Sequence, residues 1–223
     1  MPIATNIKLD KKTHVYIDTQ GKQYTSVSKI INRYKEPFDR MGNAERVSQK
    51  TGRSISEILA EWDAAAPYGT AVHKQIENYL LGNTTEIDLI QPYIPKFDAL
   101  RQSGYKLHLE TILHADDVSV AGMADLLIER DDGTWSIFDW KTNKAIYKNS
   151  FGGKKLKPPL DHLDDCNYIH YSLQLSLYAR MLGKPIHELM IIHIPKGKEE
   201  LDPILCLNLA EEVELILSEH IKG

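Results

Sequence analysis

The sequence AGMADLLIERDDGTWSIFDWKT, residues 121–142, predicts a β-hairpin around which the rest of the chain is organised. Apolar, β-branched and aromatic residues fill both arms, and the triplet DDG between them is a turn signal. A three-residue loop sets a register in which Leu127 faces Ile137 and Asp125 faces Asp139. The hairpin therefore brings two carboxylates to facing positions on neighbouring strands.

These two acids need a positive partner, because facing side chains lie about 4.5–5.5 Å apart and like charges at that separation repel. Lys141 follows Asp139 by two positions, so strand alternation directs its ammonium to the same face. Two carboxylates beside an ammonium suit a Mg²⁺ or Mn²⁺ site that hydrolyses phosphodiesters. A solvated hairpin face would show the same spacing. The apolar residues of both arms favour a buried hairpin, in which unpaired acids would be costly.

The order Asp125, Asp139 and Lys141, the last two within IFDWKT, resembles the PD-(D/E)XK nuclease superfamily and specifically its RecB-like exonuclease branch. The proline of the family name is absent, and Ala124 precedes Asp125. The resemblance implies an α/β, restriction-endonuclease-like fold, with a mixed central sheet flanked by helices and a helical N-terminal region. It also implies that the backbone carbonyl of Trp140 is a metal ligand.

Charge and composition limit the possible partners. The chain carries 27 basic and 31 acidic residues, a net charge of −4, so nucleic acid must be bound by a local basic patch. Cys166 and Cys206 lack the short spacing of a zinc or redox motif. The N-terminus shows no apolar signal segment, and no apolar run is long enough to cross a bilayer. We therefore expect a cytoplasmic protein that does not contact membranes.

We expect one nuclease domain over residues 1–223, because no repeat, low-complexity tract or linker interrupts the chain. Its parts are a mostly helical region at 1–66, a catalytic core at 67–209 and a C-terminal helix at 210–223. The family resemblance implies that the first part arches over the active-site cleft.

Several shorter elements are expected along the chain. A capping box at Ser54 and Glu57 starts a helix that we expect to end near Ala66 and Pro67. The other predicted elements are a hairpin at 13–17 and 24–27, helices at 28–36, 39–50 and 95–102, and strands at 106–113, 189–194 and 204–209.

The segment GTAVHKQIE, residues 69–77, predicts a helix on which His73 and Glu77 are neighbours, four residues apart. A histidine beside an apolar stripe can be a hydrogen-bonded core residue. The segment also resembles the GTxxHxxxE helix of RecB-like enzymes, which implies that His73 is a metal ligand. A site with an imidazole ligand favours Mn²⁺ more than a site with only oxygen ligands does. Glu77 could orient His73, bind metal through water or form a surface pair.

The strand predicted at 106–113 places Leu107, Leu109 and Leu113 on one face and Glu110 on the other. Glu110 could be an exposed edge residue. The resemblance instead implies a third carboxylate near the metal, because RecB-like sequences carry a glutamate on the strand before the one that bears the first aspartate.

A basic and aromatic loop at 143–160 follows the catalytic strand directly. Such a loop can be solvated. Beside a phosphodiesterase site, it can also neutralise phosphates and stack bases of a single strand. The side chains predicted to contact DNA are Lys144, Tyr147, Lys148, Lys154, Lys155 and Lys157.

The helix predicted at 168–182 places Gln174 and Tyr178 on one face. This pair could be a structural contact. YSLQLSLYARM also resembles the QxxxY motif of RecB-like nucleases, which implies that both side chains line the active site or touch DNA.

These motifs predict a deoxyribonuclease that uses one or two Mg²⁺ or Mn²⁺ ions. Lys141 would orient or deprotonate the attacking water and offset charge in the transition state. The order of the motifs over residues 25–180 is similar to the mitochondrial genome maintenance exonuclease group and related phage nucleases, which implies an exonuclease on single-stranded DNA or flaps. An endonuclease of the same fold and a catalytically silent DNA-binding or recombination-accessory protein are the alternatives. Which proteins it binds lies outside what the residues show.

Overall fold

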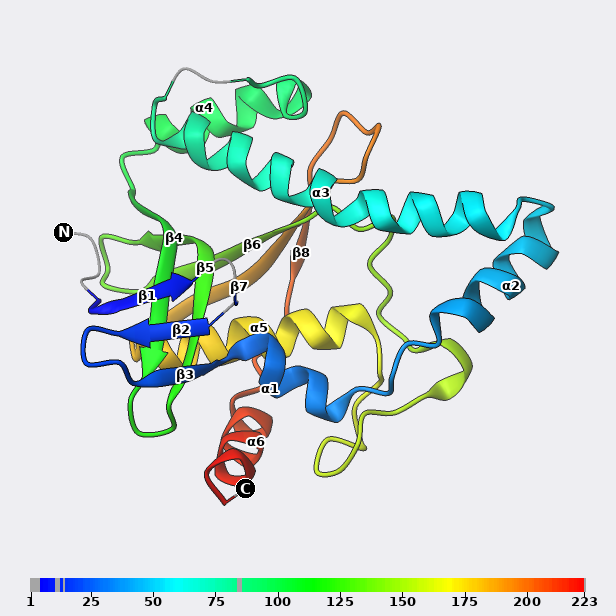
Figure 1. Ribbon diagram of the computed structural model, residues 1–223. Helices are drawn as coiled ribbons and strands as arrows, with labels where there is room; N and C mark the ends of the chain where they lie inside the picture. Colours follow the sequence, from blue (N-terminus) through cyan, green and yellow to red (C-terminus); the bar gives the residue numbers. More distant parts are fainter. Residues whose placement is uncertain (1–4, 11–12, 14, 84–85, 223) are drawn as a thin grey trace.

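The computed structural model describes residues 5–10, 13, 15–83 and 86–222, and within them the chain forms a mixed eight-stranded sheet with helices on both faces (Figure 1). This confirms the predicted α/β class. The strand order is β1-β2-β3-β5-β6-β7-β8, and β4 pairs with β5. The strands are β1 Ile7–Asp10, β2 Val15–Asp18, β3 Gln23–Ser26, β4 Lys106–Ala115, β5 Val120–Glu129, β6 Trp135–Lys141, β7 Ile186–His193 and β8 Asp202–Leu205.

The helices cover the two faces of this sheet. Figure 1 shows α3 and α4 on one side and α5 on the other, with α6 beyond α5. The helices are α1 Val27–Tyr34, α2 Arg40–Thr51, α3 Ile55–Leu80, α4 Ile94–Gln102, α5 Asn167–Leu182 and α6 Ala210–Lys222, and the short 3₁₀ turns are η1 Gln91–Tyr93 and η2 Phe151–Gly153. Among the described residues, no helix has both the length and the apolar character needed to cross a membrane.

The predicted register of the central hairpin is confirmed from the turn to Leu126 and Phe138, but the predicted facing pair of Asp125 and Asp139 lies beyond the last paired residues. Leu127 pairs with Ile137, and Gly133 closes the three-residue turn at a φ of 80°. The β5–β6 ladder extends as far as Leu126 and Phe138. Beyond that pair, β6 continues beside β7, whereas the start of β5 lies beside β3. The two strands of the hairpin therefore fork, and Asp125 and Asp139 are the residues at the fork.

Two apolar layers fix the sheet between the helices. Leu127 and Ile137 are fully buried in a cluster with residues of α5. Leu126 and Trp140 belong to a separate cluster with residues of α3 and α4. Because neighbouring residues of one strand enter opposite layers, both faces of the hairpin are buried, which explains its nearly continuous apolar sequence.

Helix α3 corrects the expectation that a helix ends near Ala66 and Pro67. The capping box at Ser54 and Glu57 is present, but the helix runs unbroken through Pro67. Buried Val72 and Ile76 fix its second half. The alanines before Pro67 are strong helix formers, and this part of the helix is exposed, so water can satisfy the carbonyl that proline leaves unpaired.

The N-terminal region combines strands with helices. The hairpin predicted at 13–17 and 24–27 corresponds to β2 and β3, although His14 lies outside the described residues. Strand β1, which pairs with β2, was not predicted. Helix α2 and the first half of α3 form an arm that projects from the sheet (Figure 1). The predicted C-terminal helix at 210–223 corresponds to α6, and Gly223 lies outside the described residues.

Candidate metal centre

The centre is built around Asp125 at the fork of β5 and β6. The Trp140 amide donates a hydrogen bond to Asp125 Oδ2 at 2.8 Å, in place of the backbone pairing that ends at Phe138. Asp125 and Trp140 are both buried. The carboxylate therefore satisfies a buried amide and at the same time points its charge into the gap between the strands.

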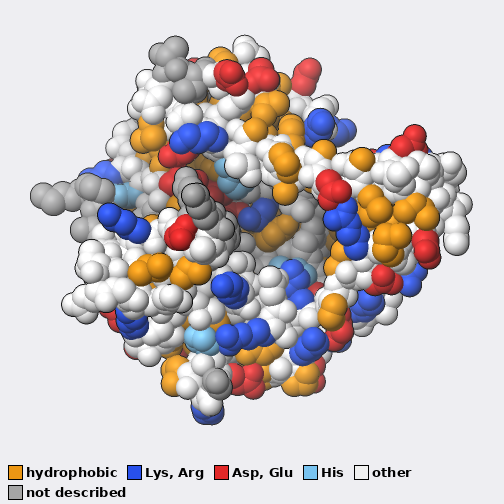
Figure 2. Space-filling view, in the orientation of Figure 1, with side chains coloured by type: hydrophobic (Ala, Val, Ile, Leu, Met, Phe, Trp, Pro, Cys, Tyr) orange, Lys and Arg blue, Asp and Glu red, His pale blue; other side chains and the backbone are white. Residues whose placement is uncertain are grey.

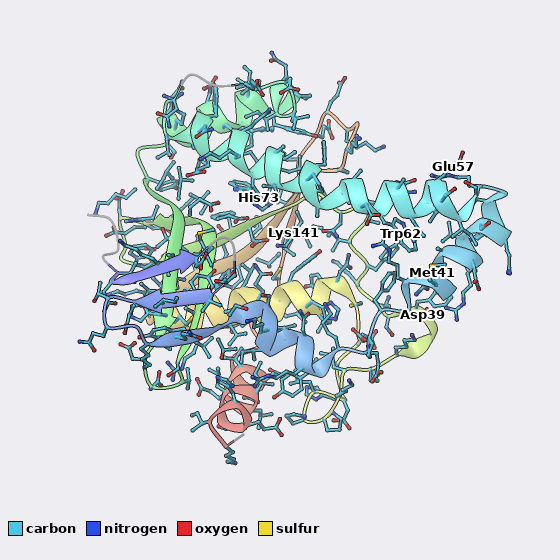
Figure 3. The ribbon with its side chains drawn as sticks, viewed as in Figure 1. Asp39, Met41, Glu57, Trp62, His73 and Lys141 are labelled. Atoms are coloured by element: carbon cyan, nitrogen blue, oxygen red, sulfur yellow. The ribbon has the colours of Figure 1, made fainter. Side chains whose placement is uncertain are left out.

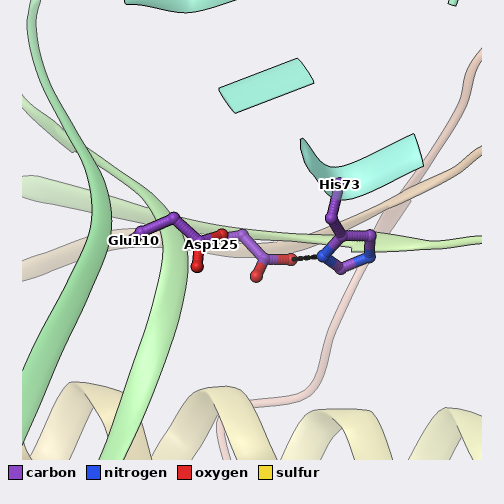
Figure 4. Close-up of side chains that lie close together, drawn as sticks. All are labelled: His73, Glu110 and Asp125. Carbon is purple, nitrogen blue, oxygen red and sulfur yellow. Dashed lines mark ion pairs between the residues drawn. The ribbon is translucent and has the colours of Figure 1, made fainter. Parts of the chain in front are cut away.

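Helix α3 brings His73 to the same carboxylate. His73 Nδ1 lies 3.4 Å from Asp125 Oδ2 (Figure 4). A Cβ atom on Gly69 would lie 3.0 Å from Thr142 Oγ1, so the helix passes very close to the chain that leaves β6. Burial lowers the pKa of His73, but the hydrogen bond and charge of Asp125 outweigh it and raise the pKa overall. A metal ion bound here would need the imidazole in its neutral form.

Glu110 reaches the centre from β4 through an irregular backbone. Its φ is +45°, in the left-handed region that side-chain-bearing residues rarely adopt. Its neighbours Leu109 and Thr111 pair with Leu126 and Ala124, so Glu110 lies at the register position of Asp125.

This backbone irregularity corrects the predicted face of the strand. Leu107 and Leu109 pack in the layer of α3 and α4, whereas Leu113 lies in the layer of α5. The prediction that they share one face is therefore wrong, because the left-handed residue between them breaks the two-residue alternation.

One ligand atom from each of His73, Glu110 and Asp125 lies within 4.8 Å of the others, which forms a potential metal-binding group among the described residues (Figure 4). Two carboxylates and an imidazole fit a hard divalent cation with some affinity for nitrogen, as Mn²⁺ has, and the carboxylates also suit Mg²⁺. The donor set therefore agrees with the cofactors expected from the sequence.

Asp139 and Lys141 form a buried ion pair beside this group. Asp139 is 2% exposed, and its Oδ2 contacts the Lys141 ammonium. Burial raises the pKa of Asp139 above its usual range, against the opposing effect of Lys141. Burial lowers the pKa of Lys141, but the charges of Asp139 and Asp125 outweigh it and raise the pKa overall. Lys141 is therefore an ammonium group in the metal-free protein.

Gln174 and Tyr178 hold Asp139 from α5. The Gln174 Nε2 donates to Asp139 Oδ1 at 2.8 Å and to the Tyr178 hydroxyl at 3.1 Å. Tyr178 lies directly on Gly122 of β5, where an added Cβ would be 2.6 Å from Tyr178 Cε1. The glycine of the GMAD segment therefore gives the tyrosine the room that it needs to pack beneath the metal centre.

Tyr171 is a neighbour of the centre that the sequence reasoning missed. The Lys141 Nζ lies 4.8 Å from the centre of its ring. Tyr171 precedes Gln174 by three residues, so the helical spacing that joined Gln174 to Tyr178 would also have placed Tyr171 on that face.

Glu77 lies farther from the acids of the fork. Its carboxylate forms an ion pair with Lys74 at 2.8 Å, which is the surface pair considered for it. It also lines a cavity of about 540 Å³ together with His108, Glu110 and Thr111. The centre therefore borders an open cavity through Glu110.

The basic loop after β6 contains lysines that form ion pairs, and aromatic and basic side chains that are exposed. Lys155 forms an ion pair with Asp164 at 2.7 Å, and Lys157 lies 3.8 Å from Glu36. Tyr147 is 65% exposed, and Phe151 is 87% exposed. Lys144, Lys148 and Lys154 are also exposed, and the Lys148 ammonium lies 5.4 Å from the centre of the Tyr168 ring.

The surface is hollowed between α3 and α5, and basic and acidic side chains gather in and around the hollow (Figure 2). His73 and Lys141 lie close to one another on its inner side, His73 from α3 and Lys141 from β6 (Figure 3). The arm carries Met41 and Trp62 to one side of it (Figure 3). The charged centre is therefore accessible from the hollow face.

No protein-family model and no curated protein matches this chain. Two solved structures are similar to it at 14% identity. One, the crystal structure of SSO0001, matches 88% of this chain and 74% of its own, with a TM-score of 0.40. The other, named "Putative exonuclease" and from Eubacterium rectale, matches 89% of this chain and 79% of its own, with a TM-score of 0.49. At such low similarity, function has to be argued from the metal centre alone.

Proposed function

We propose that this protein is a divalent-metal-dependent deoxyribonuclease of the RecB-like branch of the PD-(D/E)XK superfamily. The observation that carries the proposal is the grouping of His73, Glu110 and Asp125 at a strand fork, with the ion pair of Asp139 and Lys141 beside them. The carboxylates of Glu110, Asp125 and Asp139 come from three strands of the sheet, β4, β5 and β6, and oxygen ligands of this kind suit a hard divalent cation.

The proposed metal ligands are His73, Glu110, Asp125 and Asp139, with the backbone carbonyl of Trp140 as a further ligand. One or two Mg²⁺ or Mn²⁺ ions would lower the pKa of a bound water and polarise the scissile phosphate. The ammonium of Lys141 would offset the charge that develops on the phosphate oxygens. Gln174 and Tyr178 keep the Asp139 carboxylate turned toward the fork.

The proposed substrate is single-stranded DNA with a free end, or a flap, digested as by an exonuclease. The exposed rings of Tyr147 and Phe151 support this choice, because stacked bases of a single strand bind to such rings. The exposed Lys144, Lys148 and Lys154 offer phosphate contacts in the same loop, which a chain with a net charge of −4 needs locally. Lys155 and Lys157 would join them if their ion pairs open, and Glu77 is proposed to act only through water.

The test is digestion of end-labelled single-stranded, duplex and flap DNA, with Mn²⁺, with Mg²⁺ and with a chelator. We expect metal-dependent shortening of linear single strands and flaps, and no digestion with the chelator. A covalently closed single-stranded circle separates the alternatives. Persistent cleavage of the circle would identify an endonuclease, whereas DNA binding without cleavage of any substrate would identify a silent accessory protein.

A further inference from the structure

Tyr171 lies on α5 with its ring against the side chain of Lys141. The distance from Lys141 Nζ to the ring centre, 4.8 Å, is within the range of cation–π attraction. The Lys141 side chain is only 17% exposed, so little water competes for the ammonium. The carboxylate of Asp139 and the ring face of Tyr171 therefore hold the same ammonium.

The ring of Tyr171 is itself fixed in place. Its hydroxyl donates to Asn143 Oδ1 at 2.6 Å. The backbone carbonyl of Asn143 accepts a hydrogen bond from His193 Nε2 at 2.6 Å, and His193 is the β7 partner of Lys141. Tyr171 therefore contacts both Lys141, through its ring, and Asn143, through its hydroxyl. These contacts restrain Asn143, two residues beyond the end of β6, as well as the ammonium.

The ring becomes most important when Asp139 binds metal. Both oxygens of this carboxylate are already engaged, Oδ2 by Lys141 and Oδ1 by Gln174. Donation of either oxygen to a metal weakens the attraction between Asp139 and Lys141, because the negative charge is then shared. Lysine has a long flexible stem and a single point charge, so a second contact is needed to keep the ammonium in place.

We propose that Tyr171 is a positioning residue that keeps the Lys141 ammonium at the metal centre through its ring face. The inference rests on the proposed function, in which this ammonium stabilises the transition state. The hydroxyl of Tyr171 has the lesser part, since it orients the ring and does not touch Lys141.

Two substitutions separate the ring from the hydroxyl. Tyr171→Leu removes the ring, and Tyr171→Phe keeps the ring but removes the hydrogen bond to Asn143. In Mn²⁺-dependent cleavage of labelled single-stranded DNA, we expect Tyr171→Leu to lower kcat about tenfold, within the range that loss of one cation–π contact can produce. We expect KM and the affinity for Mn²⁺, measured by calorimetry, to stay within twofold, and Tyr171→Phe to keep most of kcat.

Tyr105 offers a control variant, because its ring also contacts a cationic side chain. The Arg130 guanidinium lies 5.7 Å from the centre of the Tyr105 ring, near the β5–β6 turn, so Tyr105→Leu removes a similar contact away from the centre. It should leave kcat unchanged. Equal kcat in Tyr171→Leu and the wild type would overturn the inference. A tenfold loss of Mn²⁺ affinity in Tyr171→Leu would also overturn it, because Tyr171 would then support the centre as a whole.

A spectroscopic measurement tests the contact without relying on cleavage. In protein labelled with ¹³C at the lysine Cε, the Lys141 signal is assigned with Lys141→Arg. The ring current should shift this signal upfield in the wild type and in Tyr171→Phe, with and without Mg²⁺, and the shift should vanish in Tyr171→Leu. If the Lys141 signal of Tyr171→Leu stays at the wild-type chemical shift, the inference is overturned. A shifted signal in a wild-type protein that cleaves no DNA would overturn only the proposed function.

Discussion

The Trp140 amide donates a hydrogen bond to Asp125 Oδ2 across the fork of β5 and β6. Through it, the carboxylate stabilises the fold, in addition to the metal-binding role that we propose for it, and two substitutions separate these roles. Asp125→Asn keeps an oxygen that can accept the bond but loses the charge. Asp125→Ala loses both and leaves the buried Trp140 amide unpaired, which costs about 1–3 kcal/mol.

We therefore expect both variants to lose Mn²⁺ binding in calorimetry, and only Asp125→Ala to lower the free energy of unfolding in urea by about that amount. In the wild type, Mn²⁺ should raise Tm, because the ion binds only the folded protein. Retention of Mn²⁺ binding by Asp125→Asn would argue against a metal ligand at this position.

The ion pair of Asp139 and Lys141 makes a prediction for catalysis. Asp139→Ala and Lys141→Ala should each lower metal-dependent digestion of end-labelled DNA by about 10²-fold or more, because each removes charge that acts on the transition state. Circular dichroism should show an intact fold. Lys22→Ala, on the turn between β2 and β3, is the matched control and should digest DNA at the wild-type rate. Normal digestion by either site variant would remove the mechanism proposed here.

Gly122 makes a packing prediction. A Cβ atom at this position would lie 2.6 Å from Tyr178 Cε1 and 3.0 Å from Val27 Cγ2. Gly122→Ala should therefore lower the free energy of unfolding by about 1–3 kcal/mol. It should also lower kcat, because a displaced Tyr178 no longer supports Gln174 beneath Asp139. Urea unfolding and cleavage kinetics of the same preparation check both effects. An unchanged free energy of unfolding would show that α1, which carries Val27, and α5, which carries Tyr178, can move to make room for the added methyl group.

The loop after β6 makes a prediction for DNA binding. Lys154→Ala should raise KM with little change in kcat, and should reduce the slope of log affinity against log salt by about one. Lys155→Ala should have a smaller effect on the salt slope, because Lys155 already forms an ion pair with Asp164. Fluorescence anisotropy with labelled single-stranded DNA over a range of salt concentrations measures both slopes. Identical slopes for Lys154→Ala and the wild type would mean that Lys154 does not contact phosphate.

The central hairpin could be predicted from sequence because its register depends on local features, namely the three-residue turn and the apolar pattern. The same rule predicted that the pairing continues to Asp125 and Asp139, whereas the paired ladder ends at Leu126 and Phe138. The prediction that a helix ends near Pro67 was wrong, because it considered only the local effect of proline. The packing of Val72 and Ile76 that sustains α3 involves residues distant in sequence.

The irregularity at Glu110 could not be predicted, since nothing in the residues of β4 indicates a left-handed glutamate. It lies at the register position of Asp125, where the pairing of β5 with β6 ends. The contact of Tyr171 with Lys141 depends on how closely α5 approaches β6, and helical spacing alone gives the face of a residue and not its distance from another element.

The continuity of α3 through Pro67 has a mechanical consequence. The helix has 26 residues and is thus about 39 Å long at 1.5 Å per residue. The arm lies at one end of this helix, and His73 lies near the other end. Buried Val72 and Ile76 anchor the end that carries His73. One continuous helix therefore fixes both the position of the arm and the position of the imidazole beside Asp125.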